Sequence, residues 1–298
     1  MKQFLVIISI VSAVITSCTD QKPDTAPAEP PFAEQGKAYV LDSTIEVAGR
    51  QGVACDGKYY YISSSTALYK YTLQGELVKS NEDPFTELEL EANHLGDIDV
   101  YNGDIYTGIE TFIDGVGKNI QVAVYDAETM EYKYSIPWNK ESGQVEVCGL
   151  AVDREHNRVW MADWVQGHEL YYYDLATKTY EGKVRLSPAP QLQQGIYCRN
   201  GQILISCDDG DAEKDESDHL YIADVYQNDQ PVDTAEVKLW REMTDFKRVG
   251  EIEGLTFNPL TDNLIVLSNR GARIILGMPK GFYEGYDREI HEIYIYGK

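Results

Sequence analysis

The sequence lacks the motifs by which contiguous active sites are recognised. It has no Ser/His/Asp signature, no HExxH, no phosphate-binding loop and no cysteine spacing typical of zinc. Basic residues are also few: 26 Lys and Arg stand against 49 Asp and Glu, for a formal net charge of −23. This balance argues against nucleic acid as a partner and against charge-driven binding to anionic membranes. It remains compatible with a cation such as Ca²⁺, with a neutral sugar, or with solubility alone.

Cysteine is sparse. Apart from Cys18, the chain has four: Cys55, Cys148, Cys198 and Cys207. A tight turn at Asn200-Gly201 would set Cys198 opposite Ile203 rather than Cys207. We therefore expect mostly buried free thiols rather than disulfides.

Only the N-terminus carries a long apolar run, and it is too short and wrongly flanked for a transmembrane helix. The run leads into small residues and Cys18, and residues 15–18 resemble the lipobox of bacterial lipoproteins. The resemblance implies a signal peptide over residues 1–18 and lipidation of Cys18. We expect an exported protein of the bacterial cell envelope that contacts the membrane through its lipid anchor only. Thr19 in place of Asp favours the outer membrane.

Residues 19–36 are rich in Pro, Ala, Asp and Glu and predict a flexible tether. Residues 37–298 are then enough for one large β domain. Five segments of this part share a pattern of glycine, alternating apolar residues, a turn and a second apolar strand. The glycines that begin them are spaced 44 to 59 residues apart: Gly52, Gly96, Gly149, Gly195 and Gly254.

Third and fourth strands follow most of these hairpins, so the repeat predicts an all-β fold, a β-propeller of four-stranded blades. Five units use up the domain, and five blades are our prediction. Six blades remain the alternative, with an unrecognised unit between Gly195 and Gly254. The last unit lacks a fourth strand, which residues 38–47 are expected to supply, closing the ring.

Because the two inner strands of a blade are antiparallel, the start of the first and the end of the second lie at the same mouth of the ring. The polar residues at these positions are the candidate site. The candidate ligand-binding residues are Gln51, Glu110, Asp163, Trp164, Gln194, Asp208, Asn269 and Arg270.

Asp97 and Glu253 stand beside axial glycines and would repel each other in a narrow channel, so a cation or an arginine is expected to relieve them. Arg270 is the candidate arginine. The candidate cation is Ca²⁺ or another divalent ion, with Asp97 and Glu253 as its ligands. His94 would act as the acid or base if the site is catalytic. The acidic loop 208–218 lacks EF-hand spacing and is expected to be solvated, with loose Ca²⁺ binding as the alternative.

This repeated pattern of glycine, alternating apolar residues and a turn resembles that of the NHL-repeat and gluconolactonase-like (senescence marker protein) propellers. Members of the latter family hold a divalent metal in a six-bladed channel, and Glu253-Gly254 looks like the start of that site. Calcium-activated nucleotidases and arabinanase-like glycosidases are five-bladed alternatives, although their fuller motifs do not occur here.

Three functions follow as hypotheses. The first is a monomeric, lipid-tethered propeller that binds a small-molecule or carbohydrate ligand at the polar mouth. The second is a metal-dependent hydrolase or lactonase, with Asp97, Glu253 and His94 as its catalytic residues. The third is a protein-interaction scaffold that uses the rim loops.

Overall fold

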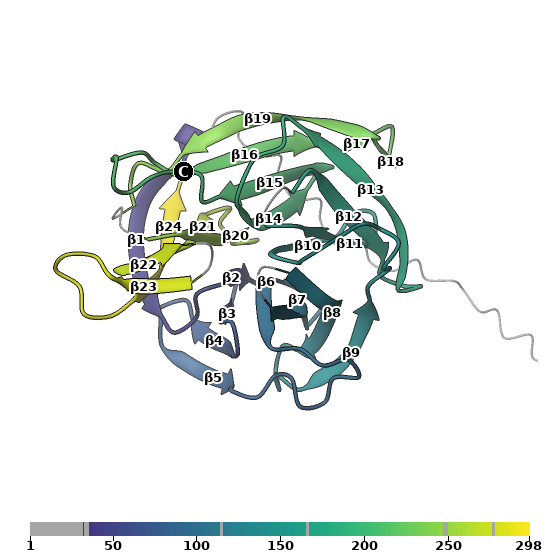
Figure 1. Cartoon of the computed structure of the whole chain (residues 1–298), viewed down its shortest axis with the longest axis horizontal. Helices are drawn as coiled ribbons and strands as arrows, with labels where there is room; N and C mark the ends of the chain where they lie inside the picture. The colour runs from purple at the N-terminus through teal and green to yellow at the C-terminus, as the bar shows by residue number, and fades with distance from the viewer. Residues whose placement is uncertain (1–31, 33–35, 114–115, 165–166, 247–249, 276–277) are drawn as a thin grey trace, which may run out of the picture.

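The computed structural model describes residues 32, 36–113, 116–164, 167–246, 250–275 and 278–298. In these segments the regular structure is β-strand apart from one short 3₁₀ helix, η1 (Gly36–Ala38). The sheets follow one another around a central axis, and the chain runs once round the ring (Figure 1). The prediction of an all-β propeller is confirmed. No helix in the described segments has the length and apolar character needed to cross a bilayer.

The first three blades are four-stranded antiparallel sheets whose strands lie in chain order. Blade 1 contains β2 (Gly52–Cys55), β3 (Tyr59–Ser63), β4 (Leu68–Thr72) and β5 (Leu77–Asn81). Blade 2 contains β6 (His94–Tyr101), β7 (Asp104–Ile113), β8 (Val116–Asp126) and β9 (Tyr132–Pro137). Blade 3 contains β10 (Gly149–Asp153), β11 (Arg158–Ala162), β12 (Glu169–Asp174) and β13 (Thr179–Ser187).

The last two blades carry inserted hairpins. Blade 4 contains β14 (Gln193–Arg199), β15 (Gln202–Cys207), β16 (His219–Asp224) and β19 (Thr234–Glu242), with the small hairpin β17 (Tyr226–Gln227) and β18 (Gln230–Pro231) between the last two. Blade 5 contains β20 (Ile252–Phe257), β21 (Leu264–Arg270), β24 (Ile290–Gly297) and β1 (Val40–Val47), and the hairpin β22 (Ala272–Ile275) and β23 (Met278–Phe282) precedes β24. The described strands thus form five four-stranded units, consistent with the expected five blades.

The N-terminal strand closes the ring, as the sequence predicted. β1 pairs antiparallel with β24, from Val40 opposite Gly297 to Val47 opposite His291, and the two lie side by side in Figure 1. Arg241 of blade 4 holds the entry to β1 by donating hydrogen bonds to the carbonyls of Gly36 (2.7 Å) and Tyr39 (2.6 Å).

Packing against the propeller begins before Lys37, the expected domain boundary. Phe32 lies in the segment expected to be a tether, yet its ring is buried. It lies 5.4 Å from the ring of Phe257 and 6.2 Å from that of Trp240, measured between centroids. An aromatic ring buried in this way contributes roughly 1.5–3 kcal/mol to stability, so Phe32 itself packs as part of the folded domain.

Blades 3 and 4 are also joined at their outer edges. β13 pairs in parallel with β19, from Arg185 opposite Thr234 to Ser187 opposite Glu236. This pairing turns the two blades into one eight-stranded sheet. It covers two outer strands whose backbone groups would otherwise be open to another chain.

The axial glycines allow neighbouring blades to approach at the backbone level. A β-carbon on Gly195 would lie 2.5 Å from the Cα of Gly254, and one on Gly254 would lie 2.7 Å from the Cα of Gly52. At the other mouth, Asn102-Gly103 and Asn200-Gly201 form the expected tight turns. All four have left-handed φ values between 51° and 79°, as type I′ turns require.

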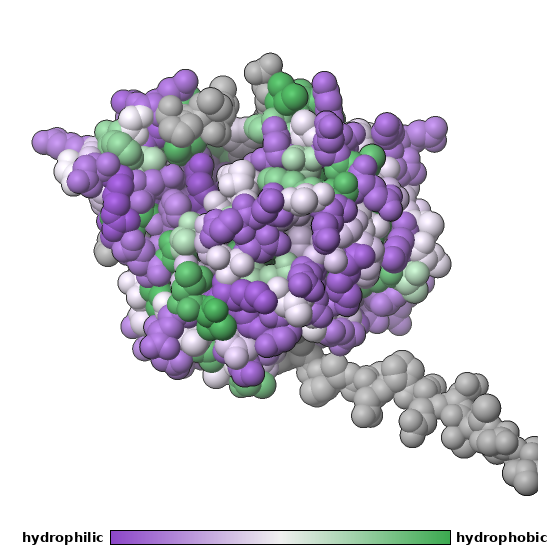
Figure 2. Space-filling model, turned by 90° about the horizontal axis from the view of Figure 1, so that it is seen from below, coloured by the Kyte–Doolittle hydropathy of each residue, from purple (hydrophilic) through white to green (hydrophobic). Residues whose placement is uncertain are grey.

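Hydrophobic clusters fill the spaces between neighbouring blades. Among the described residues, the largest fully buried side chain is Trp160, which packs in the cluster between blades 3 and 4. Cys55, Cys148, Cys198 and Cys207 are buried free thiols, as predicted, and Cys198 does lie opposite Ile203. Polar side chains dominate the side of the molecule seen in Figure 2, where apolar spots are separate and small.

Candidate functional site

The register of the inner strands confirms that their starts and ends share one mouth. His94 at the start of β6 lies opposite Glu110, and in blade 4 Gln193 lies opposite Cys207. In blade 5, Ile252 lies opposite Ser268. Residues that are far apart in sequence are therefore gathered at one end of the axis.

Asp97 lies on the axis itself and is buried. Its Oδ1 accepts a hydrogen bond from the backbone N–H of Ile98 (2.9 Å), and its Oδ2 accepts from Ile196 (3.1 Å) and Leu150 (3.4 Å). These donors come from blades 2, 3 and 4, so one carboxylate ties three inner strands together. Burial nevertheless raises the pKa of Asp97 well above its usual value, against the effect of these N–H donors.

Glu253 is also buried, but its carboxylate has partners other than those of Asp97. Asn269 donates to its Oε1 from Nδ2 over 2.5 Å, and Arg50 lies 4.0 Å away. Arg50 also forms ion pairs with Glu251 at 3.0 Å and Glu289 at 3.4 Å. We call Arg50, Glu251, Glu253 and Glu289 the arginine cluster. Burial, and next the charge of Glu251, raise the pKa of Glu253 well above its usual value.

The arginine beside Glu253 is therefore Arg50 and not Arg270. Arg270 makes a two-point ion pair with Glu292, at 2.8 Å and 3.0 Å, and stands over the ring of Tyr286. Because Arg270 stands at the end of β21, the sequence predicted that its side chain would lie at the mouth. The alternation of side chains along β21 instead directs Asn269 to Glu253 and Arg270 to the neighbouring strand β24.

A second acidic group lies at the same mouth between blades 2 and 3. We call Glu110, Glu146 and Asp163 the carboxyl triad. Backbone N–H groups of Val147 and Trp164 donate to Glu110 (3.3 Å) and Glu146 (2.8 Å). Burial raises the pKa of Glu110 to about 8 and that of Asp163 to about 6. Burial and then the charge of Glu110 raise the pKa of Glu146 well above its usual value.

His94 adjoins the carboxyl triad. Its Nδ1 is 3.5 Å from Glu110 Oε1, yet both atoms are buried without a hydrogen-bond partner among the described residues. Burial, followed by the charge of Arg50, lowers the pKa of His94 to about 4. The imidazole is therefore neutral near pH 7 and can accept a hydrogen bond.

The remaining candidates are less central. Gln51 donates weakly to Ser65 Oγ at 3.4 Å, and Gln194 is half-buried next to Gln193, which bonds the carbonyl of Gly167. The ring of Trp164 packs against the hydrophobic cluster between blades 3 and 4. Its indole Nε1 is buried and has no partner within the described part of the chain.

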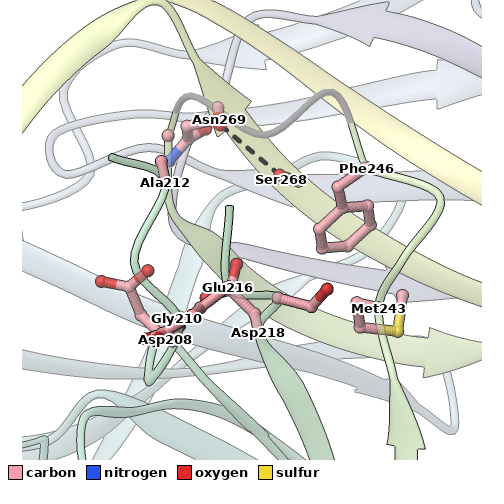
Figure 3. A pocket seen from close by; sticks show the side chains of 11 residues that line it. Asp208, Gly210, Ala212, Glu216, Asp218, Met243, Phe246, Ser268 and Asn269 are labelled. Atoms are coloured by element: carbon pink, nitrogen blue, oxygen red, sulfur yellow. Dashed lines mark hydrogen bonds between the residues drawn. The ribbon is translucent and has the colours of Figure 1, made fainter. Parts of the chain in front are cut away.

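Asp208 lies on a cavity between blades 4 and 5, which holds about 30 Å³ (Figure 3). Asp208 follows β15, while Ser217 and Asp218 precede β16. Asn269 lines the cavity from β21. Burial and then the charge of Asp218 raise the pKa of Asp208 well above its usual value, and burial raises that of Asp218 to about 7.

Sequence reasoning missed several residues of these groups. They are Arg50, Glu146, Glu251 and Glu289, whereas Asp218 belongs to the acidic loop 208–218 for which calcium binding was the alternative. Arg50, Glu146 and Glu251 precede the first strand of their blades by one to three residues. That shared position is the signal that could have found them. Glu289 precedes the later strand β24 and had no such signal.

No group of three or more His, Cys, Asp and Glu side chains in the described ranges is placed to hold a metal ion. The residues expected to ligate one together, Asp97 and Glu253, make separate sets of contacts. Oxygen donors for a hard cation are nonetheless present, in the carboxyl triad and around the cavity at Asp208.

Comparisons with known proteins show the fold and not the function. No family model matches this chain, and no curated protein does, so they give no support to the NHL-repeat or gluconolactonase-like resemblance. The crystal structure of the RRP9 WD40 repeats is similar to 88% of this chain and 99% of its own, with 10% identity and a TM-score of 0.50. The hydrazine synthase of Kuenenia stuttgartiensis is similar to 83% of this chain and 62% of its own, with 9% identity and a TM-score of 0.44.

Proposed function

We propose that this chain is a lipid-anchored β-propeller that binds a small polar ligand, such as a sugar, at the mouth that carries the carboxyl triad and the arginine cluster. The supporting observation is the set of buried oxygens without partners there. Glu110 Oε1 and Gln193 Oε1 have no hydrogen-bond donor among the described residues, and both residues are fully buried. A buried acceptor without a donor costs about 1–3 kcal/mol, which a ligand hydroxyl would recover.

The charges at the mouth set the class of ligand. The two groups contain six carboxyl residues and one arginine: Glu110, Glu146, Asp163, Glu251, Glu253, Glu289 and Arg50. An anion would add repulsion to a site in which every one of these carboxyl groups except Glu289 already has a raised pKa. A neutral polyhydroxylated molecule or a cationic one supplies donors at no such cost, and we place a carbohydrate first.

His94 supports a second candidate, a hydrolase or lactonase acting at the same mouth. A neutral imidazole 3.5 Å from Glu110 can accept a hydrogen bond from water or a hydroxyl nucleophile, and a pKa of about 4 makes it a weak base for removing the proton. A divalent ion held near the mouth would polarise the carbonyl under attack.

A binding measurement with the full chain in detergent separates these candidates. We expect a sugar panel to reveal a ligand in calorimetry, with the Glu110→Gln variant binding about tenfold more weakly. Asp229→Asn, an exposed charge change in the β17–β18 turn, should bind as the unaltered chain does. Ligand binding that is equal in Glu110→Gln and the unaltered chain would rule out this site. Turnover of lactones or esters that is lost in His94→Gln would instead establish the enzyme.

The anchor has its own test. Incorporation of labelled fatty acid should require Cys18, and Cys18→Ser should leave the protein unlabelled and in the soluble fraction. Fractionation of outer and inner membranes then tests the outer-membrane location. A labelled Cys18→Ser chain would refute the anchor without bearing on the ligand.

A further inference from the structure

The cavity between blades 4 and 5 combines charged and neutral oxygens around one small space. Asp208 and Asp218 line it together with Ser217 and Asn269 (Figure 3). Within the described residues, no lysine or arginine forms an ion pair with either aspartate.

Two neutral oxygens point to a ligand rather than to a chance gathering of acids. Ser217 is 5% exposed, lines the cavity, and its Oγ has no hydrogen-bond partner among the described residues. Asn269 is 2% exposed, and its Oδ1 likewise has no partner. Buried side-chain oxygens normally find a donor, so two of them on one cavity call for a bound group.

The orientation of the Asn269 amide is fixed by its other contacts. Its Nδ2 donates both to Glu253 Oε1 (2.5 Å) and to the backbone carbonyl of Arg50 (3.1 Å). Turning the amide over would place its oxygen against these two acceptors and lose both hydrogen bonds. Asn269 Nδ2 therefore bonds Glu253 and Arg50 of the arginine cluster, and Asn269 Oδ1 is available to another partner.

We propose that this cavity binds one Ca²⁺ ion, with the carboxylates of Asp208 and Asp218 and the neutral oxygens of Ser217 and Asn269 as ligands. Calcium accepts six to eight oxygen ligands in flexible geometry and tolerates such a mixture, with water completing the shell. Magnesium demands a near-ideal octahedron, and zinc prefers nitrogen and sulfur; neither His nor Cys lines the cavity. Neither Asp97 nor Glu253 lines this cavity, although the Asn269 amide nitrogen bonds Glu253.

The loop that supplies the ligands is built to bring them together. Gly210 N–H donates to Asp218 Oδ1 at 3.1 Å, and Asp211 and Glu216 form a β-bridge that closes the loop. His219 and Tyr221 bond to Asp209 instead, at 2.8 Å and 2.6 Å, and keep that carboxylate occupied. Asp208 and Asp218 remain for the ion.

This inference does not depend on the sugar ligand proposed above, because the ion is tested alone. The full chain in detergent is treated with a chelator, freed of it, and titrated with CaCl₂ in a calorimeter. We expect one Ca²⁺ per chain, a higher melting temperature with Ca²⁺, and weaker binding of Mg²⁺. Asp208→Asn and Asp218→Asn should each weaken Ca²⁺ binding about tenfold or more, whereas Asp229→Asn should change it less than about twofold.

The melting temperature without calcium provides a second readout. Because neutralising one carboxylate relieves repulsion, Asp208→Asn in chelator should melt at or above the unaltered chain. Ser217→Ala keeps the charge and should fold normally, yet weaken binding about threefold; it decides the matter if the aspartate variants fail to fold. Absence of calcium binding in the unaltered chain would overturn the proposal, as would unchanged affinity in Ser217→Ala and in the aspartate variants that fold.

Discussion

Arg50 and Glu251 form a 3.0 Å ion pair that joins the entrance of blade 1 to the entrance of blade 5. Both side chains are largely buried, and Arg50 is also the cation nearest to Glu253 and Glu289. One guanidinium therefore offsets three carboxyl groups. Removing the guanidinium leaves buried negative charge without a partner. This loss destabilises a protein more than replacing both partners of the ion pair by apolar residues does.

We expect Arg50→Met to lower the free energy of unfolding by about 3–5 kcal/mol. Each kcal/mol lost should lower the melting temperature by roughly 2–4 °C. The loss should shrink at acidic pH, where the carboxyl groups become protonated. Arg288→Met removes an exposed pair with Glu46 and should change stability by less than about 1 kcal/mol. Melting curves at neutral and acidic pH test this, and equal losses in the two variants would contradict it.

Gly254→Ala should destabilise the ring. Its β-carbon would lie 2.7 Å from the Cα of Gly52 and would also collide with Asp97 Oδ1. Because these contacts are with backbone and a fixed carboxylate, relief requires blades 1 and 5 to separate, at a cost of about 1–3 kcal/mol. Gly297→Ala has no atom within 4 Å of the new β-carbon and serves as the control. A Gly254→Ala chain as stable as Gly297→Ala would show that the axis is not tightly packed.

Stability should decrease as the pH rises from 6.5 to 8. Glu110 has a pKa of about 8 in the folded chain against an ordinary 4.5, so between these values the folded state binds more protons than the unfolded state. Stability then falls with rising pH across that window. His94, with its pKa lowered from 6.5 to about 4, acts in the opposite sense, but only below about pH 6.5.

The melting temperature measured at both pH values tests this expectation. Other carboxyl groups with raised pKa values, such as Glu146, act in the same direction as Glu110. Glu110→Gln should therefore reduce the fall without abolishing it. A melting temperature that rises between pH 6.5 and 8, or an identical fall in the variant, would show that Glu110 is ionised in the folded chain at neutral pH.

Asp97→Asn distinguishes a structural carboxylate from a metal ligand. An amide group would present N–H donors to strands that already point N–H groups at this position. We expect a loss of about 1–3 kcal/mol in stability with calcium affinity unchanged. Calcium affinity reduced about tenfold at unchanged stability would instead establish Asp97 as a ligand of an axial ion.

The repeat could be predicted from the sequence because each blade is marked by short-range signals of its own. Glycine at the axis, left-handed turns at Asn102-Gly103 and Asn200-Gly201, and alternating apolar residues are all short-range signals. The closing strand could be predicted because blade 5 was one strand short. The parallel pairing of β13 with β19 could not, since it depends on the paths of two outer strands and not on either strand's composition.

The site was predicted in outline only. Strand order placed Glu110, Asp208 and Asn269 at one mouth, where the structure also has them, but the partner of each was set by side-chain direction. Arg270 and Asn269 are adjacent in β21 and point to different neighbours. Arg50 lies in an irregular segment just before β2, where no alternation indicates which way a side chain faces.

The pairing of β1 with β24 has a consequence for the order in which the chain can fold. Partners such as Val40 and Gly297 lie about 250 positions apart, and contacts of such separation are slow to form. During synthesis the strand made first must stay unpaired until the strand made last is available. Until then β21 and β1 both present open edges, so this is the interval in which the protein is most exposed to aggregation and to proteolysis.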